Sequence, residues 1–273
     1  MENNLSLTLD ALASSGIVLS NEQKSAFTVS IPLKKAEAAL KSLSLFGKIA
    51  ASNGKDYFIA EGKGKAYYFD NKLVAETKFF YTQDCVKWLD LNPVDEETSK
   101  RCLTINTTMS GDPSQVYTVT EPAPKAEGAA EAAAEEGAEP AAEEAEEPAE
   151  VSFEYTELQR LQTMIQDIKK DSSIAPKGAY ITTGDNDLIL NKAFAGLEYP
   201  EKLESYVLAG ESKTLADGLP GSWSLHYDSF SSTAVVRNLL WPGHAFYYSG
   251  ETNSWGSLYF GAGMKNTEFI FMR

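Results

Sequence analysis

Residues 238–250, NLLWPGHAFYYSG, place a Trp-Pro-Gly corner between two runs of apolar and aromatic residues. Pro242 fixes φ and lacks an amide donor, and Gly243 permits a bend that other residues resist, so together they predict a turn between strands. Trp241 brings a large apolar surface that we expect to be buried. The corner therefore predicts a β-structure whose aromatic residues form a core or a subunit interface, with a ligand pocket as the less favoured interpretation.

The same pattern continues on both sides of the corner. From Trp223 to the C-terminus, short runs rich in β-branched and aromatic residues alternate with turn residues, which predicts antiparallel strands. The expected strands are SWSLHYD (222–228), TAVVRNLLW (233–241), HAFYYS (244–249), SLYF (257–260) and EFIFM (268–272). The candidate structural or interface residues of this region are Trp223, Trp241, Pro242, Gly243, Phe246, Tyr247, Gly256, Tyr259, Gly261 and Gly263.

A helical pattern precedes these strands. Leucine and isoleucine recur at heptad spacing, at positions 158, 161, 165 and 168, within YTELQRLQTMIQDIKK (155–170). Two heptads are too few for a coiled coil, so the pattern predicts one helix that docks on a sheet. We expect a strand and a turn over 174–191, followed by another short helix over 199–208.

Most of the negative charge lies in one segment. Residues 121–150 contain eleven Glu and one Lys, a net charge of −10, so the other 243 residues carry only −5 of the total of −15. This Ala, Glu and Pro segment has nothing large to bury, which predicts a disordered acidic linker or insertion. It separates an N-terminal block, residues 1–120, from a C-terminal block, residues 151–273, and the two blocks can also form one domain. The position of the charge argues against nucleic-acid binding, because phosphate contacts need Lys and Arg.

The N-terminal block begins with helices. An apolar face over residues 5–12 predicts a short helix that Gly16 ends, and Ser20–Gln23 has the spacing of a capping box before a second helix. Pro32 predicts a break or a new start in that helix, with 33–46 as its continuation.

Two hairpins follow the helices. The first, over 46–62, turns at Asn53-Gly54, and the second, over 66–81, turns near Asp70-Asn71. Both blocks therefore place helices before strands. This order predicts the α+β class, with short helices packed on antiparallel β-sheets and a β-rich C-terminal half.

The sequence has no motif for catalysis, for a cofactor or for a metal ion. His226 and His244 both fall in predicted strands, without a second imidazole at ligand spacing. Cys85 and Cys102 match no zinc or redox motif and are expected to be free thiols. The GDND at 184–187 lacks the further oxygens of a calcium loop and is interpreted as a hairpin turn.

The sequence also gives expectations about membranes and targeting. The N-terminus lacks the basic and apolar regions of a signal peptide, and no run of apolar residues is long enough to span a bilayer. We therefore expect a soluble intracellular protein with no membrane partner.

Several segments resemble the radial spoke head proteins of motile cilia. GSWSLHY (221–227), VVRNLLWPGHAFYY (235–248) and GSLYFGAGMKN (256–266) resemble the C-terminal signature of that family. SGDPSQVY (110–117) and IAPKGAYI (174–181) also resemble it, in the same order and at similar distances. The resemblance covers nearly the whole chain except the acidic segment.

The resemblance implies a structural role rather than an enzymatic one. It implies a subunit of the radial spoke head in the 9+2 axoneme of cilia and flagella, which assembles with the larger spoke head proteins 4 and 6 and has no cofactor. Radial spoke heads meet the projections of the central pair and pass mechanical signals that regulate dynein. It thus implies a cytoskeletal location in the axoneme and a multi-protein complex.

An alternative from a different class remains open at this point. A small-ligand or carbohydrate-binding β-domain also uses aromatic side chains, provided that they are exposed and that polar groups converge on them. The residues that would serve such a site are Trp241, Tyr247, Tyr248, Trp255 and Tyr259.

Overall fold

A computed structural model gives the structure of the protein. The residues that it describes are 5–64, 67–69, 72–74, 77–122, 150–182, 188–208 and 213–268. Their four α-helices are α1 (Leu5–Leu12), α2 (Asn21–Glu37), α3 (Glu96–Leu103) and α4 (Glu157–Ser172). Short 3-10 turns lie at Ala13–Ser15, Leu203–Ser205 and Leu215–Asp217.

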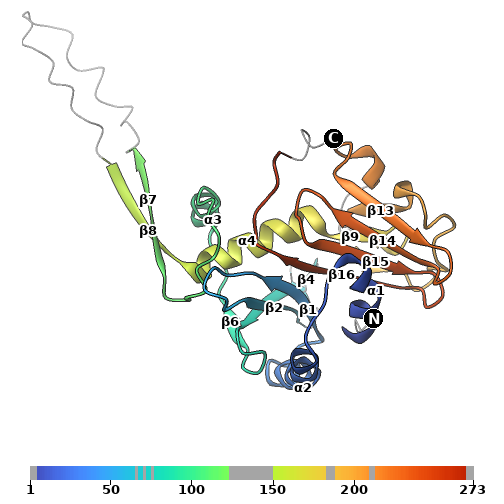
Figure 1. Ribbon diagram of the computed structural model, residues 1–273, viewed down its shortest axis with the longest axis horizontal. Coiled ribbons are helices and arrows are strands. Elements are labelled where there is room, and N and C mark those ends of the chain that lie inside the picture. Colours follow the sequence, from blue (N-terminus) through green and yellow to red (C-terminus); the bar gives the residue numbers. More distant parts are fainter. Residues whose placement is uncertain are drawn as a thin grey trace, which may run out of the picture.

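The centre of the fold is an eight-stranded sheet built from both blocks (Figure 1). Its strands, in order across the sheet, are β13 (Trp223–Asp228), β14 (Thr233–Asn238), β15 (His244–Ser249), β16 (Ser254–Gly261), β1 (Ser42–Ile49), β2 (Tyr57–Lys63), β5 (Thr77–Thr82) and β6 (Leu89–Leu91). The α+β prediction and the antiparallel C-terminal strands are confirmed. The strand predicted over 268–272 lies, apart from Glu268, outside the described residues.

One pair of strands departs from the antiparallel expectation. β1 and β16 run parallel, with Gly47 opposite Tyr259, so the sheet is mixed. Parallel strands cannot be joined by a tight turn, and these two come from opposite ends of the chain. Gly47 is needed at this place because a Cβ there would overlap the backbone of Tyr259.

Small two-stranded sheets complete the structure. They pair β3 (Tyr67–Phe69) with β4 (Lys72–Val74), β7 (Val116–Pro122) with β8 (Glu150–Thr156), β9 (Ile174–Pro176) with β12 (Tyr206–Leu208), and β10 (Tyr180–Thr182) with β11 (Leu188–Leu190). The predicted hairpin at Asn53-Gly54 is confirmed as the connection from β1 to β2. β3 and β4 form the second predicted hairpin, although Asp70, Asn71 and the 184–187 turn lie outside the described residues.

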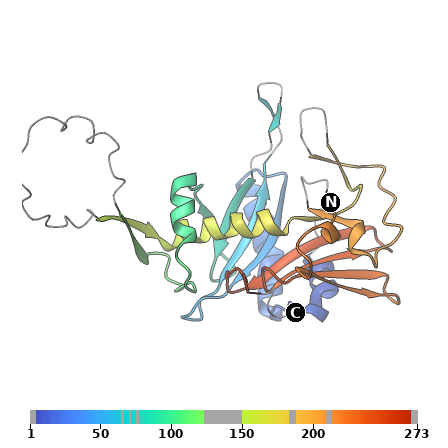
Figure 2. The same ribbon diagram turned by 90° about the horizontal axis from the view of Figure 1, so that it is seen from above.

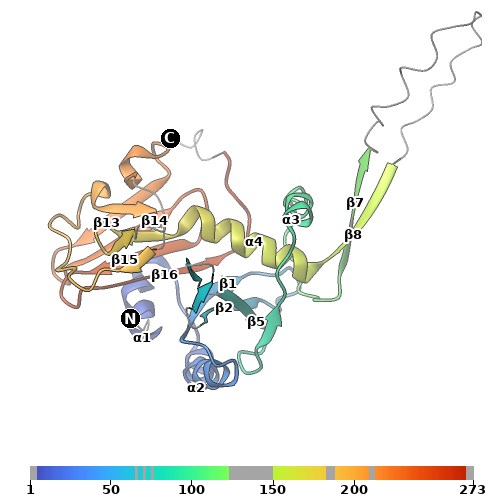
Figure 3. The same ribbon diagram turned by 180° about the vertical axis from the view of Figure 1, so that it is seen from behind.

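Helices cover both faces of the sheet (Figures 1 and 3). α1 and α2 pack on one face, where Phe27 meets Phe58 with ring centroids 5.2 Å apart. α4 packs on the opposite face through its predicted apolar stripe, in which Ile165 is fully buried. A third cluster on that second side joins β9 and β12 to the sheet, with Tyr206 against Phe246.

The start of α2 is as predicted, but its middle is not. The Gln23 amide donates to Ser20 Oγ and the Ser20 amide donates to Gln23 Oε1, both at 3.1 Å, which is the predicted capping box. Pro32 was expected to break the helix, yet α2 continues to Glu37. Pro32 and Thr28 are both exposed, so the Thr28 carbonyl that lacks its amide donor can bond to water instead.

The continuation predicted over 33–46 is also wrong. α2 ends at Glu37, Ala39 adopts a φ of +51°, and β1 begins at Ser42. Burial explains the difference, because alternate residues of β1 from Leu45 onward are buried in the sheet.

The short helix predicted over 199–208 is wrong as well. Only Leu203–Ser205 form a 3-10 turn, and the next three residues form β12, which pairs with β9. Tyr206 is fully buried and its hydroxyl donates to the Pro200 carbonyl at 2.7 Å. The burial of Tyr206 and the pairing of β12 with β9 hold this segment in an extended conformation.

β7 and β8 form a ribbon that projects from the body beyond the N-terminal end of α4 (Figure 2). The ribbon flanks the acidic segment, whose residues 123–149 lie outside the described residues. Pro122 pairs with Glu150, so the chain leaves the fold and returns to it at one place. The division into two blocks stays a prediction, and the sheet that both blocks share supports the one-domain alternative.

Candidate assembly site at the Trp-Pro-Gly corner

The corner begins where β14 ends. Asn238 Oδ1 accepts hydrogen bonds from the amides of Leu240 at 2.9 Å and Trp241 at 3.4 Å, which turns the chain out of the strand. The His244 amide then donates to the Trp241 carbonyl at 3.0 Å, and β15 starts. The turn predicted from Trp-Pro-Gly is therefore present and is closed by its own backbone.

Glycine is required at this turn. Gly243 has a φ of +100°, and a Cβ there would overlap the Phe260 carbonyl oxygen of β16. Its carbonyl accepts the Phe260 amide at 2.9 Å. Gly261 also lies close to the turn, because a Cβ on it would come within 2.5 Å of the Pro242 carbonyl oxygen. The corner thus packs backbone against backbone over the end of β16.

Trp241 anchors the corner to α4. Its side chain is 2% exposed, and its Nε1 donates to Asp171 Oδ2 at 3.0 Å in the last turn of α4. Lys265 Nζ binds the same carboxylate oxygen at 2.7 Å and lies 5.7 Å from the centre of the Trp241 ring. Pro242, the next residue, is exposed. The prediction that Trp241 is buried is confirmed.

Tyr259 makes a second link to α4. It is 1% exposed, and its hydroxyl accepts the Gly263 amide at 2.8 Å. Burial raises the pKa of Tyr259 to about 12. Gly263 is pressed against Met164 of α4, whose side chain a Cβ at that position would overlap. Glycine at this position therefore permits the contact between the chain after β16 and the helix.

The ten candidate residues do not form one site. Six of them meet at the corner: Trp241, Pro242, Gly243, Tyr259, Gly261 and Gly263. Trp223 and Phe246 belong instead to the cluster around Tyr206, and Tyr247 faces α1, where its hydroxyl lies 3.5 Å from Thr8 Oγ1. Gly256 pairs with Tyr247 in the middle of the sheet. Their role as an interface stays a prediction.

The exposed-aromatic alternative is not supported. Of its five residues, Trp241, Tyr247, Tyr248 and Tyr259 are buried, and only Trp255 is partly accessible. A ligand-binding platform needs exposed aromatic faces, whereas four of these five side chains are packed in the core of the protein.

Sequence reasoning missed a buried carboxylate at the other end of α4 from the corner. Glu157 is fully buried at the start of α4 and accepts five hydrogen bonds. Tyr57 and Tyr117 hydroxyls donate at 2.7 Å each, the Ser110 amide and hydroxyl at 3.0 and 2.6 Å, and the Gly111 amide at 2.8 Å. Only the SGDPSQVY turn signalled this site, because its residues supply four of the five donor groups.

The charge state of Glu157 follows from these contacts. Burial alone would raise the pKa of its carboxyl, but the hydrogen bonds from Ser110, Tyr117 and Tyr57 outweigh burial and hold it below the usual value. Burial and this carboxylate together raise the pKa of Tyr57. The site holds one fixed negative charge and links α4, β2, the 110–111 loop and β7.

One turn later, Arg160 is buried as well. Its Nη2 donates to the carbonyls of Ile105 and Thr107, and its guanidinium lies over the Tyr117 ring at 5.0 Å. With Glu157, it fixes the loop after α3 and the root of the ribbon onto α4. These are structural contacts without an open reaction site.

Several features bear on chemistry. Within the described ranges no group of three or more His, Cys, Asp or Glu side chains could hold a metal ion. Cys85 and Cys102 are free and buried, and burial raises the pKa of the Cys85 thiol to about 11. In the same part of the chain no helix is long and apolar enough to cross a membrane.

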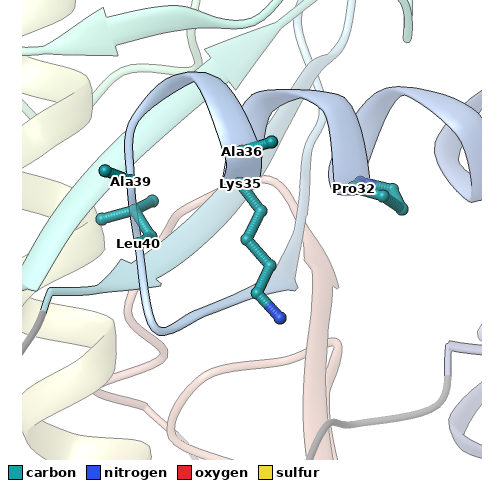
Figure 4. A pocket seen from close by; sticks show the side chains of 5 residues that line it. All are labelled: Pro32, Lys35, Ala36, Ala39 and Leu40. Atoms are coloured by element: carbon teal, nitrogen blue, oxygen red, sulfur yellow. The ribbon is translucent and has the colours of Figure 1, made fainter.

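An open pocket of about 340 Å³ lies at the C-terminal end of α2 (Figure 4). Its lining is formed by Pro32, Lys35, Ala36, Ala39 and Leu40. Lys35 is its single polar side chain, whereas a small-molecule site brings several polar groups together. The pocket is also separate from the corner.

His244 gives a pH-dependent test of the corner. Burial lowers its pKa from the usual 6.5 to about 3, and Nδ1 has no hydrogen-bond partner among the described residues. Between these two values the unfolded chain binds a proton that the native state does not. The free energy of unfolding should therefore be highest above about pH 6.5 and fall by up to about 3 kcal/mol on acidification to about pH 4.

Urea unfolding of wild type and of His244→Gln at a series of pH values measures this loss. The decline between about pH 6.5 and 5 should be much smaller in His244→Gln, because Glu157 begins to titrate only at lower pH. Gln115→Ala, an exposed substitution that removes no titratable group, is the control and should keep the wild-type slope. An unchanged slope in His244→Gln would show that His244 is not the titrating group.

The chain resembles known proteins over its whole length. It is 30% identical to the radial spoke head protein 9 homolog of Danio rerio over 295 residues, covering 99% of both chains. It is 31% identical to the homolog of Xenopus tropicalis, covering 98% of both, and 29% identical to that of Homo sapiens, covering 99% of both. No protein-family model matches the chain. Because 98–99% of this chain is covered, the aligned region includes both the corner and the Glu157 site.

Proposed function

Because the chain belongs to the radial spoke head protein 9 family, we propose that it is a non-enzymatic structural subunit of the radial spoke head in the 9+2 axoneme. The observation that carries the proposal is the match over 98–99% of both chains, which leaves no large unmatched region for a separate activity. The family is one of spoke head proteins rather than of enzymes.

Contacts in the interior of the protein support a mechanical role. Trp241 ties the corner to the end of α4, Tyr259 shares a core cluster with the apolar stripe of α4, and Glu157 ties the start of α4 to β2 and β7. A subunit that passes mechanical signals between central pair and dynein arms needs such internal connections, because a soft body would absorb displacement instead of transmitting it. These contacts fit that role in the ciliary axoneme.

The partners that we propose are the other spoke head subunits, proteins 4 and 6. Permanent interfaces of this kind are large and rich in Tyr, Trp and Phe. The assembled head would meet the central-pair projections, and the acidic segment would add at most a weak, salt-sensitive contribution there.

Co-expression with spoke head proteins 4 and 6, followed by size-exclusion chromatography at low and high salt, tests this proposal. We expect co-elution that survives high salt, since burial of apolar surface is little weakened by screening. A variant lacking residues 121–150 is the control and should co-elute equally well. If the full chain elutes alone at both salt concentrations, direct assembly with these partners is wrong.

A further inference from the structure

β13 forms one edge of the central sheet, and no strand among the described residues pairs with its outer side. It runs for six residues in unbroken register with β14 and contains no Pro, Lys or bulge, the usual protection of an exposed edge. The opposite edge, β6, has only three residues and contacts α4. The fold protects one edge of its sheet and leaves the other open.

The open edge presents a defined set of backbone groups. The Leu239 amide donates to the Ser222 carbonyl at 2.8 Å, just before β13 begins. Hydrogen-bonded pairs alternate along an antiparallel ladder, so even-numbered residues of β13 direct their backbone groups toward β14. Trp223, Leu225 and Tyr227 therefore present their amides and carbonyls at the outer edge.

We propose that this edge pairs with β13 of a second copy of the chain, antiparallel, with the two-fold axis at His226. In this register Leu225 pairs with Tyr227 of the second copy, and both are residues whose backbone groups face the edge. Ser224 then lies opposite Asp228 of the second copy. The two central sheets join into one, and neither copy keeps an open β13 edge.

The side chains of this register continue the existing layers. Leu225 lies beside Val236 and Tyr227 lies beside Ala234, and both β14 partners are fully buried. The pairing therefore produces an apolar row from Val236 through Leu225 and the second copy's Tyr227 to its Ala234. Leu225 and Tyr227, which are half-buried in one copy, would become covered from the side.

The charges also fit a second copy. Ser224 pairs with Arg237 inside one copy, so Asp228 of the other copy would lie on the same face as that guanidinium. β7 and β8, which flank the acidic segment, leave the body at the end opposite β13 (Figure 1). In a dimer through β13, Asp228 of one copy and Arg237 of the other thus lie in one row, two strands apart, with the Arg237 guanidinium bound to Ser14 and Ser15 of its own copy, and the two ribbons stay apart.

A residue just beyond the strand supports an interface at this place. Phe230 is 95% exposed, and its amide donates to Asp228 Oδ1 at 3.0 Å. Ser231 Oγ donates to the other oxygen of the same carboxylate at 2.8 Å. These two hydrogen bonds fix the turn so that the large apolar side chain of Phe230 lies in water. An exposed Phe side chain gains hydrophobic stabilisation only when another surface covers it.

Charge substitutions at the two-fold axis test the proposal with the purified full-length chain alone. His226 is exposed and would lie directly opposite His226 of the second copy. His226→Asp or His226→Lys should each raise the dimer dissociation constant about 5-fold, because like charges face each other across the pair. Equimolar mixing of the two variants should restore dimerisation as mixed dimers, which native mass spectrometry separates by mass.

Gln115→Asp and Gln115→Lys are the matched controls, since Gln115 is exposed and directly precedes β7, and they should leave dimerisation unchanged. Hydrogen exchange of the Leu225 and Tyr227 amides should slow as the wild-type concentration rises. A wild type that is monomeric at every concentration overturns the proposal. A dimer whose dissociation constant is unchanged in both His226 variants overturns it as well. The test uses no other subunit, so its result is independent of the proposed function.

Discussion

Glu157→Ala is expected to lower the free energy of unfolding by about 4 kcal/mol, because a buried carboxylate with five hydrogen bonds is lost. The variant leaves the Tyr57 hydroxyl and the Gly111 amide buried without their acceptor. Water reaches this site poorly, so the donors keep most of their desolvation cost. Chemical denaturation at neutral pH measures the change.

Two comparisons make the Glu157 result specific. Glu157→Gln keeps the shape and should lose about 2 kcal/mol, because its amide nitrogen meets donors where the carboxylate oxygen accepted. Glu154→Ala removes an exposed carboxylate from β8 and should change stability by less than about 0.5 kcal/mol. Equal, small losses in Glu157→Ala and Glu154→Ala would contradict the role given to Glu157.

Trp241→Ala is expected to cost about 3 to 5 kcal/mol, the range for removing a large buried aromatic side chain. The change opens a cavity between the sheet and α4 and deprives Asp171 of the indole donor. The loss should appear in thermal or urea unfolding, and assembly with spoke head proteins 4 and 6 should weaken with it.

Neighbouring and conservative variants separate packing from hydrogen bonding at the corner. Trp241→Phe keeps most of the apolar surface and loses the bond to Asp171, so its cost should be well below that of Trp241→Ala. Pro242→Ala, at the exposed adjacent position, should cost less than about 1 kcal/mol. A Trp241→Ala protein that is as stable as wild type and still assembles would show that the corner is not structural.

Local features of the fold could be predicted from the sequence. The capping box at Ser20 and Gln23 spans four residues, and the Trp-Pro-Gly turn depends on backbone limits of its own residues, so both are readable without the rest of the chain. Pro32 misled for a physical reason. The Thr28 carbonyl, which lacks an amide donor from Pro32, is at an exposed position where water can bond to it. That exposure is a property of the folded molecule and is not visible in the sequence.

Long-range features could not be predicted from the sequence. Glu157 meets Tyr57 across 100 residues of chain and Tyr117 across 40, and nothing near Glu157 distinguishes it from an ordinary helix-capping glutamate. Likewise, Gly47 reads as a flexible point in a strand until Tyr259 is placed against it. The aromatic residues were assigned to a core or a subunit interface, and which of them share a site depends on that pairing.

The parallel pairing of β1 with β16 also determines when the nascent chain can complete its central sheet. β1 leaves the ribosome well before Ser254–Gly261, the strand that flanks it on one side. About 200 residues separate them, which at typical elongation speeds means roughly 10 to 40 s of translation. During that interval β1 can pair with β2, but its other edge stays unpaired, and an unpaired strand edge is the kind of surface through which folding intermediates aggregate.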